Sequence, residues 1–151
     1  VPLRDLRQAA IAIASVLARS RNTGRVAVLH AHDWHAALAV YYAKALASSV
    51  RGIPCVYTIH NLAFQGQERA STTPYLDIAW DAFHSIFEDH GTLNLMRGAL
   101  IASDRITTVS PTYAHEIRTA RYGHGLDGVL RWLSPKLRGI TNGVDVHSWN
   151  P

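Results

Sequence analysis

Six consecutive residues, from His30 to His35, concentrate side chains that can do chemistry. The stretch HAHDWH places His30, His32, Asp33 and His35 directly after an apolar run. Imidazole nitrogens and carboxylate oxygens bind borderline-soft cations such as zinc, and a histidine can also exchange a proton near neutral pH. These residue types allow three interpretations: a metal site, a catalytic histidine, or a strand end that is polar for structural reasons.

The spacing within this stretch argues against the metal interpretation. It resembles the His-x-His-x-Asp-His signature of the metallo-β-lactamase-like hydrolases, but Trp34 stands where that family has its aspartate. His35 is expected inside the following helix, away from the strand that carries His30. We therefore predict no metal site, and a metal-dependent hydrolase that uses these histidines stays as an alternative.

His32 is the candidate catalytic residue. It is expected at the end of a strand, with the first turn of the next helix behind it and Asp33 as the N-cap of that helix. The positive end of a helix disfavours an imidazolium, so a neutral His32 could hydrogen-bond a sugar or alcohol hydroxyl. We expect His30 and His35 to be structural, with hydrogen bonds across strand ends.

The elements that must position His32 alternate between helix and strand. Apolar periodicity, β-branched runs and turn residues predict this order. The expected elements are a helix over 3–20, a strand over 26–29, a helix over 34–47, a strand over 55–60, a loop over 61–74, helical sequence over 78–103, a strand over 105–109, a helix over 111–120, a short helix over 126–133 and a strand over 137–141. This alternation predicts an α/β fold, a Rossmann-like parallel sheet with flanking helices.

Polar residues follow all four predicted strands. They are His32-Asp33, His60-Asn61, Ser110 and Asn142. Ligands bind at the carboxyl edge of open parallel sheets, so these residues mark a candidate binding edge. The amides of Asn61, Gln65 and Asn142 each offer a donor and an acceptor in one plane, which suits vicinal hydroxyls. For Asn142-Gly143, a tight turn explains the residues equally well.

Composition and the remaining motifs narrow the function classes. The 151 residues carry a net charge of +4 without a block of like charges, which argues weakly for an anionic ligand and against nucleic acid. The single cysteine, Cys55, excludes an internal disulfide. Apolar stretches are too short and interrupted to predict a membrane span. GHGLDG (123–128) has dinucleotide-fingerprint spacing but follows a helix, so we predict a turn-rich loop.

Five motifs in order resemble the bacterial glycogen synthase and plant starch synthase family. They are HAHDWHAAL, YTIHNLAFQG, DRITTVSPTYAHEI, YGHGLDGVL and TNGVDVHSWNP. The resemblance implies a retaining glycosyltransferase of the two-Rossmann-domain (GT-B) architecture. Such an enzyme transfers glucose from ADP-glucose or UDP-glucose to the non-reducing end of an α-1,4-glucan, without a metal or other cofactor.

The resemblance also implies roles for individual residues and parts of the chain. His32 would contact the donor glucose, with Asp33 beside it, while His60, Asn61, Gln65 and Gly66 would line the acceptor side. Ser110 would begin a helix at the site, and Asn142 would lie in the segment that leads into the hinge. We expect residues 1–141 to be part of an N-terminal catalytic domain and 142–151 to start the interdomain hinge.

The family pattern also extends beyond this sequence. A glycine-rich, lysine-containing loop and a second Rossmann domain are not present, so we expect a piece of a longer cytoplasmic protein, or a plastid one if the source is a plant. Arg97 replaces the lysine of the family's middle motif, and His90 replaces its aromatic residue. Alternatives are another two-Rossmann retaining glycosyltransferase and a non-catalytic glucan-binding module.

Overall fold

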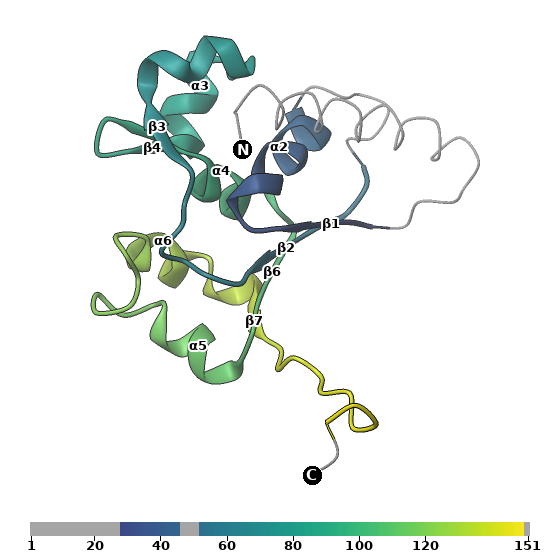
Figure 1. Ribbon diagram of the computed structural model, residues 1–151. Coiled ribbons are helices and arrows are strands. Elements are labelled where there is room, and N and C mark those ends of the chain that lie inside the picture. The colour runs from purple at the N-terminus through teal and green to yellow at the C-terminus, as the bar shows by residue number, and fades with distance from the viewer. Residues whose placement is uncertain (1–27, 46–51, 150–151) are drawn as a thin grey trace, which may run out of the picture.

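A parallel sheet of four strands forms the centre of the protein. The computed structural model describes residues 28–45 and 52–149, so the helix predicted over 3–20 lies outside the described residues. The strand order is β1-β2-β6-β7 and every neighbouring pair is parallel (Figure 1). These strands are β1 (Leu29–His32), β2 (Cys55–Ile59), β6 (Arg105–Thr108) and β7 (Leu137–Gly139). The predicted parallel α/β sheet is confirmed.

The first strand extends further than predicted. Of the strand expected over 26–29, residues 26 and 27 lie outside the described residues and Val28 is not in a strand; β1 covers Leu29–His32 and so includes His30 and His32. Its side chains alternate, with Leu29 and Ala31 buried and His30 and His32 exposed. A strand places alternate side chains on opposite faces, so the two histidines share one face of the sheet. The apolar run alone did not reveal a strand whose second face is polar.

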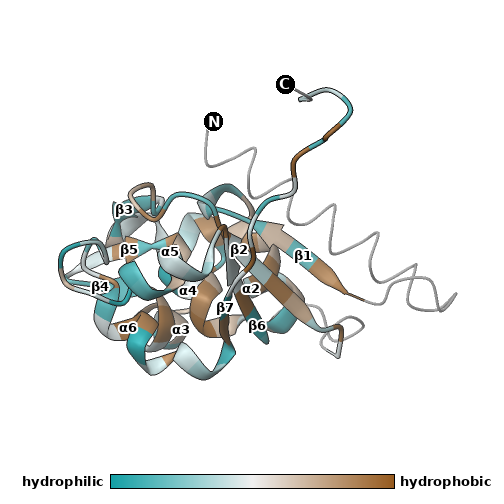
Figure 2. Ribbon diagram, turned by 90° about the horizontal axis from the view of Figure 1, so that it is seen from below, coloured by the Kyte–Doolittle hydropathy of each residue, from teal (hydrophilic) through white to brown (hydrophobic). Residues whose placement is uncertain are grey.

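Two helices cover the opposite face of this sheet. They are α2 (Ala37–Ala45), entered through the 3-10 turn η1 (Trp34–Ala36), and α4 (Leu95–Ala102). The helix predicted over 34–47 therefore has a 3-10 first turn. The small alanines of α2 let this helix approach α4 closely. The Tyr41 ring of α2 meets the ring of Phe87, which precedes α4 in the chain, edge-on with the ring centroids 5.0 Å apart. Figure 2 shows hydrophobic colour concentrated on the inner strands and on these two helices.

The segment between β2 and α4 contains a small antiparallel sheet, so the continuous helical sequence predicted over 78–103 is wrong. The loop predicted over 61–74 is likewise interrupted by secondary structure. The elements are β3 (Gln67–Arg69), the 3-10 helix η2 (Ala70–Leu76), α3 (Trp80–Ala82), the π-helical turn η3 (Phe83–Phe87), β4 (Glu88–Asp89) and β5 (Thr92–Asn94), with strand order β3-β5-β4. His90 and Gly91 join β4 to β5 with φ of 50° and 82°. Two residues with positive φ make a tight hairpin turn, which ends the helix.

The C-terminal third follows the predicted order with shorter elements. It contains α5 (Pro111–Glu116), α6 (Asp127–Trp132) and the 3-10 turn η4 (Ser134–Lys136) before β7. The helices predicted over 111–120 and 126–133 and the strand predicted over 137–141 all form, but each ends early. Residues 140–149 are exposed and leave the body as a tail (Figure 1).

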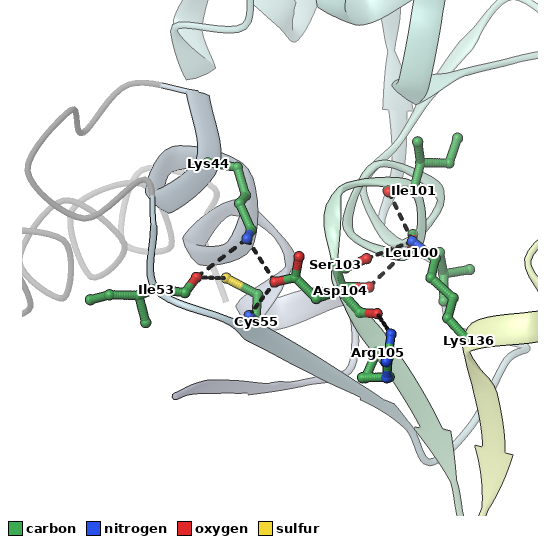
Figure 3. Close-up of polar contacts among 9 residues, drawn as sticks. All are labelled: Lys44, Ile53, Cys55, Leu100, Ile101, Ser103, Asp104, Arg105 and Lys136. Atoms are coloured by element: carbon green, nitrogen blue, oxygen red, sulfur yellow. Dashed lines mark hydrogen bonds and ion pairs between the residues drawn. The ribbon is translucent and has the colours of Figure 1, made fainter. Parts of the chain in front are cut away.

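A polar cluster ties the elements together at the amino edge of the sheet (Figure 3). The Asp104 carboxylate accepts hydrogen bonds from Lys44 Nζ and from the Cys55 main-chain N–H, both at 2.6 Å. Lys136 Nζ donates to the carbonyl of Ile101 at 3.0 Å, at the end of α4. These contacts join α2, β2 and the α4–β6 turn, and they leave the carboxyl edge to other residues.

Candidate active site

The carboxyl edge of the sheet carries a pocket of about 190 Å³. Its lining comes from all four strands or the residues that directly follow them: His30, His32, Thr58, His60, Thr107, Thr108, Val109, Ile140 and Asn142. His32 and Asn142 are more than a hundred positions apart in the sequence, yet both line this pocket together with His60. The parallel sheet brings them together because all four strands end on the same side.

His32 and His60 are in direct contact. His32 Nδ1 lies 3.0 Å from His60 Nε2, and one of these two nitrogens must carry the proton of the hydrogen bond. The contact occupies Nδ1 of His32, so Nε2 is the nitrogen left for a ligand. Partial burial lowers the pKa of His32, the neighbouring His30 and His60 lower it further, and Asp33 opposes them. The neutral imidazole is thus favoured, as the sequence predicts, although the main cause is burial rather than a helix terminus.

The Asp33 side chain holds the two strand ends together. Asp33 is the N-cap residue of η1 by position, as predicted, and its carbonyl accepts the Ala36 N–H, but its side chain makes no cap hydrogen bond. The carboxylate instead accepts the main-chain N–H of His60 at 2.9 Å and that of Asn61 at 3.5 Å. The Asp33 backbone has φ 52° and ψ −179°, a combination that only glycine adopts readily. This geometry turns the carboxylate across to the β2 loop.

A second pocket of about 280 Å³ adjoins this carboxylate. Its lining is Asp33, Trp34, His35, Asn61 and Phe64, and the Phe64 side chain is 65% exposed. Asn61 Oδ1 accepts the main-chain N–H of Ala63 at 3.0 Å, which fixes the turn that presents Phe64. Aromatic faces beside an amide and a carboxylate suit a sugar ring with its hydroxyls.

Gln65 and Gly66 support this loop from the interior. The Gln65 side chain is buried; its Nε2 donates to the carbonyls of Leu62 at 3.1 Å and His124 at 3.0 Å, and its Oε1 accepts from Asn94 at 2.6 Å. Its amide groups thus hydrogen-bond within the protein and do not line either pocket. Gly66 has φ of 65°, and a Cβ there would lie 2.6 Å from the Trp34 ring. Both residues position the loop.

Ser110 also has a structural role in this geometry. Its side chain accepts the main-chain N–H of Tyr113 at 2.9 Å and caps α5, whose start the sequence predicts at this point. It lines neither pocket. Gly139 passes so close that a Cβ would lie 2.1 Å from the Ser110 carbonyl oxygen, which explains why β7 needs glycine there.

Sequence reasoning missed three hydroxyl groups at the site. Thr58 and Thr107 line the first pocket, and Tyr113 Oη accepts the main-chain N–H of Leu62 at 3.1 Å. The alternation along β2 and β6 could have found the two threonines, because they share a face with His32 through the register of the strands. Tyr113 acts across 51 positions and has no local signature.

His35 lies apart from His30 and His32. Its ring packs at a tilt against Trp34, with the ring centroids 4.0 Å apart, and it lines the second pocket with Asp33. Within residues 28–45 and 52–149, no group of three or more His, Cys, Asp or Glu side chains could hold a metal ion. Over the same residues, no helix has both the length and the apolar character that a membrane crossing needs.

Comparison with known proteins identifies the family. Residues 5–132 match the model of the starch synthase catalytic domain. The chain belongs to the starch synthase catalytic domain family. Among its relatives, glycogen synthase from Leptothrix cholodnii is 51% identical over 128 residues, which are 82% of this chain and 26% of the relative. Glycogen synthase from Myxococcus xanthus is 44% identical over 128 residues, again 82% of this chain and 27% of the relative.

The fold of the starch synthase family is also found in a solved structure. The catalytic domain of starch synthase IV from Arabidopsis thaliana, bound to ADP and acarbose, superposes with a TM-score of 0.83 at 31% identity. The match covers 97% of this chain and 31% of that one. The predicted Rossmann-like sheet of a GT-B starch synthase is thereby confirmed. This chain spans about a quarter of the length of its glycogen synthase relatives.

Proposed function

We propose that this chain is part of the N-terminal domain of a retaining glucosyltransferase. The reaction is transfer of glucose from ADP-glucose or UDP-glucose to the non-reducing end of an α-1,4-glucan. The observation that carries the proposal is the pair of pockets built from consecutive residues of the β1 and β2 ends: His32 and His60 line the first, and Asp33, Asn61 and Phe64 line the second. Donor and acceptor sugars need two such adjoining sites.

Each pocket has a role in this proposal. His32 contacts the donor glucose through Nε2, because Nδ1 is engaged by His60. The acceptor glucan lies against Phe64 and Trp34, with the Asn61 amide available to its hydroxyls. His60 and Asp33 connect the two sides, while Gln65, Gly66 and Ser110 hold the loops. Charge on the departing diphosphate has to be stabilised by cationic groups from outside these pockets.

A second Rossmann domain completes the proposed enzyme. Asn142 lines the donor-side pocket, and the exposed tail that follows it is the start of the proposed hinge, with the domain boundary between residues 141 and 142. No cofactor is required, and neither nucleic acid nor a membrane is a partner. We place the whole protein in the bacterial cytoplasm, as its bacterial relatives suggest.

The exposed Phe64 favours one other function, a glucan-binding module without catalysis. Titrating the labelled chain with maltohexaose, followed by NMR, tests the acceptor pocket. We expect shifts at Trp34, Asn61 and Phe64, and loss of binding in Phe64→Ala. Trp132→Ala is the matched control, because Trp132 is 68% exposed on α6 and lines neither pocket. Binding that survives Phe64→Ala would place the glucan elsewhere.

Transfer itself is tested in a chimera. The chain replaces the 128 residues that it matches in the Leptothrix glycogen synthase, and ADP release is measured from ADP-glucose plus glycogen. We expect activity in the chimera and its loss in His32→Ala. A folded chimera without transfer would leave only the glucan-binding module.

A further inference from the structure

A ladder of hydrogen bonds crosses three strands beneath the histidine pair. His30 Nε2 lies 2.7 Å from Thr58 Oγ1, and Thr58 Oγ1 lies 2.6 Å from Thr107 Oγ1. The three residues belong to β1, β2 and β6, which are neighbours in the sheet, and all three line the donor-side pocket. A histidine on an exposed strand face has several rotamers, and this ladder selects one of them.

The His30 ring, so held, packs against His32. The two ring centroids lie 4.3 Å apart with an interplanar angle of 30°, and the His32 and His60 ring centroids are 5.3 Å apart. His32 therefore contacts the His30 ring and hydrogen-bonds to His60 through Nδ1. A half-turn of its ring about χ2 would exchange Nδ1 with a carbon and break the hydrogen bond with His60. Contact with His30 opposes that half-turn, since the ring would have to sweep through it.

We propose that His30 is a positioning residue: the Thr58–Thr107 ladder fixes its ring, and its ring holds His32 with Nδ1 on His60 and Nε2 facing the pocket. The sequence predicts only a structural role for His30. The geometry adds that this role acts on the orientation of one particular side chain. The inference rests on the proposed function only for what Nε2 then contacts.

The electrostatic surroundings of His32 agree with this arrangement. The titratable groups that face it are His30 and His60, which lower its pKa after burial has done so, and Asp33, which raises it. Repulsion from His30 across the ring contact therefore favours the neutral form of His32.

Imidazole nitrogen NMR of the 151-residue chain tests the proposal directly. Long-range proton–nitrogen spectra report the tautomer of each histidine. In the wild type we expect one tautomer for His32. Thr58→Val replaces the hydroxyl with a methyl group and so breaks the ladder. In this variant and in His30→Leu, we expect tautomers and ring orientations of His32 to mix, which moves its two nitrogen resonances towards each other. His30→Leu should also raise the pKa of His32, because the electrostatic effect by which His30 lowers that pKa is lost.

Two controls separate positioning from general stability. Thr58→Ser keeps a hydroxyl and should restore the wild-type His32 spectrum, whereas a merely structural role would not make the spectrum depend on that hydroxyl. His35→Gln removes the neighbouring histidine that stacks on Trp34 instead, and should leave His32 unchanged. If His30→Leu fails to fold, the Thr58→Val and Thr58→Ser pair carries the test. An unchanged His32 spectrum in folded Thr58→Val overturns the proposal, whether or not the chimera transfers glucose.

Discussion

Asp33 shows at the scale of one residue how this site stores strain. Its backbone lies at φ 52° and ψ −179°, where a side chain costs about 1–3 kcal/mol. That conformation directs the carboxylate to the N–H groups of His60 and Asn61, which hold the β2 loop against β1. Since no regular element requires this conformation, the two carboxylate contacts are its physical justification.

Two substitutions at Asp33 separate the strain from the contacts. Asp33→Ala removes the carboxylate and keeps the strain, and we expect it to cost about 1–3 kcal/mol of unfolding free energy. Asp33→Gly also removes the carboxylate, but it relieves the backbone strain. The greater conformational entropy of unfolded glycine offsets about 0.5–1 kcal/mol of this gain, and we still expect Asp33→Gly to be the more stable of the two variants. Urea unfolding measures both. Equal stability would mean that the strain is no larger than the entropy cost of glycine.

The lowered pKa of His32 predicts a pH dependence of stability. Folding lowers this pKa below its ordinary value of 6.5, so the unfolded chain binds more protons there than the folded one. The stability that a neutral His32 contributes is therefore complete above pH 6.5 and is lost as pH falls below it. Denaturation at a series of pH values measures this loss, and His32→Gln should flatten it below pH 6.5. A variant with the wild-type slope in that window would contradict the assignment.

Residue types alone predicted which residues lie at the site better than they predicted the role of each residue there. His32, His60 and Asn142 could be predicted because each lies at or shortly after the end of a strand, and strand ends are local features of a sequence. Gln65 could not be assigned correctly, since its partners Asn94 and His124 are 29 and 59 positions away. A free amide and a buried structural amide look the same in sequence; only tertiary contacts separate them.

At the scale of elements, the Asp104 carboxylate links α2, β2 and the α4–β6 turn through its hydrogen bonds to Lys44 and to the Cys55 N–H. Burial raises the pKa of this carboxyl, but hydrogen bonds from Lys44 and the Cys55 N–H, with the charges of Lys44 and Lys136, lower it further than burial raises it. The net pKa is below its ordinary value of 3.8. The ionised form is therefore stabilised by the fold, and it joins helix to strand.

Replacing Asp104 tests this joint. Asp104→Asn should cost about 1–3 kcal/mol at pH 7, since a charge-assisted acceptor is lost. Because the folded pKa is depressed, the wild-type contribution is present above pH 3.8 and disappears as pH falls through the lower folded value, so the variant should unfold with a flatter acid dependence. Denaturation at pH 7 and pH 3 measures both effects.

Asp127→Asn is the matched control for Asp104. Asp127 also accepts a cation at 2.6 Å, from Arg131 one helical turn away, so this pair joins no separate elements. Ion pairs one turn apart on a helix contribute about 0.3–0.5 kcal/mol, so we expect a change below about 1 kcal/mol. A cost as large as that of Asp104→Asn would show that the junction of elements has no special weight.

The order of elements could be predicted where period and turn chemistry agree, as for β2, β6 and α5. The hairpin from Glu88 to Asn94 could not, because its strands are two and three residues long and its His90-Gly91 turn sits within helix-compatible sequence. The pairing of β5 with β3, more than twenty positions away, determines the structure of this segment. Local periodicity does not record such a pairing.

The whole molecule divides its sheet between two tasks. Ionic joints gather at the amino edge, while strained and polar loops gather at the carboxyl edge, where the two pockets lie. Stability and binding are thereby carried by opposite ends of the same strands. The tail beyond β7 leaves from the carboxyl edge, where Ile140 and Asn142 line the first pocket: residues 140–149 are exposed, and the Ile140 N–H donates to the Thr108 carbonyl.

Truncation tests the proposed domain boundary. Removing residues 143–151 should change the unfolding free energy by less than about 0.5 kcal/mol, since exposed side chains without buried partners contribute little. Removing residues 139–151 should lower the unfolding free energy measurably more. It deletes Gly139, the last residue of β7, and the hydrogen bond from the Ile140 N–H to the Thr108 carbonyl. Both truncations are compared by urea unfolding. A hinge can reorient a second domain only if the first domain is stable without it. A large loss of unfolding free energy on removing residues 143–151 would therefore place the domain boundary after the tail.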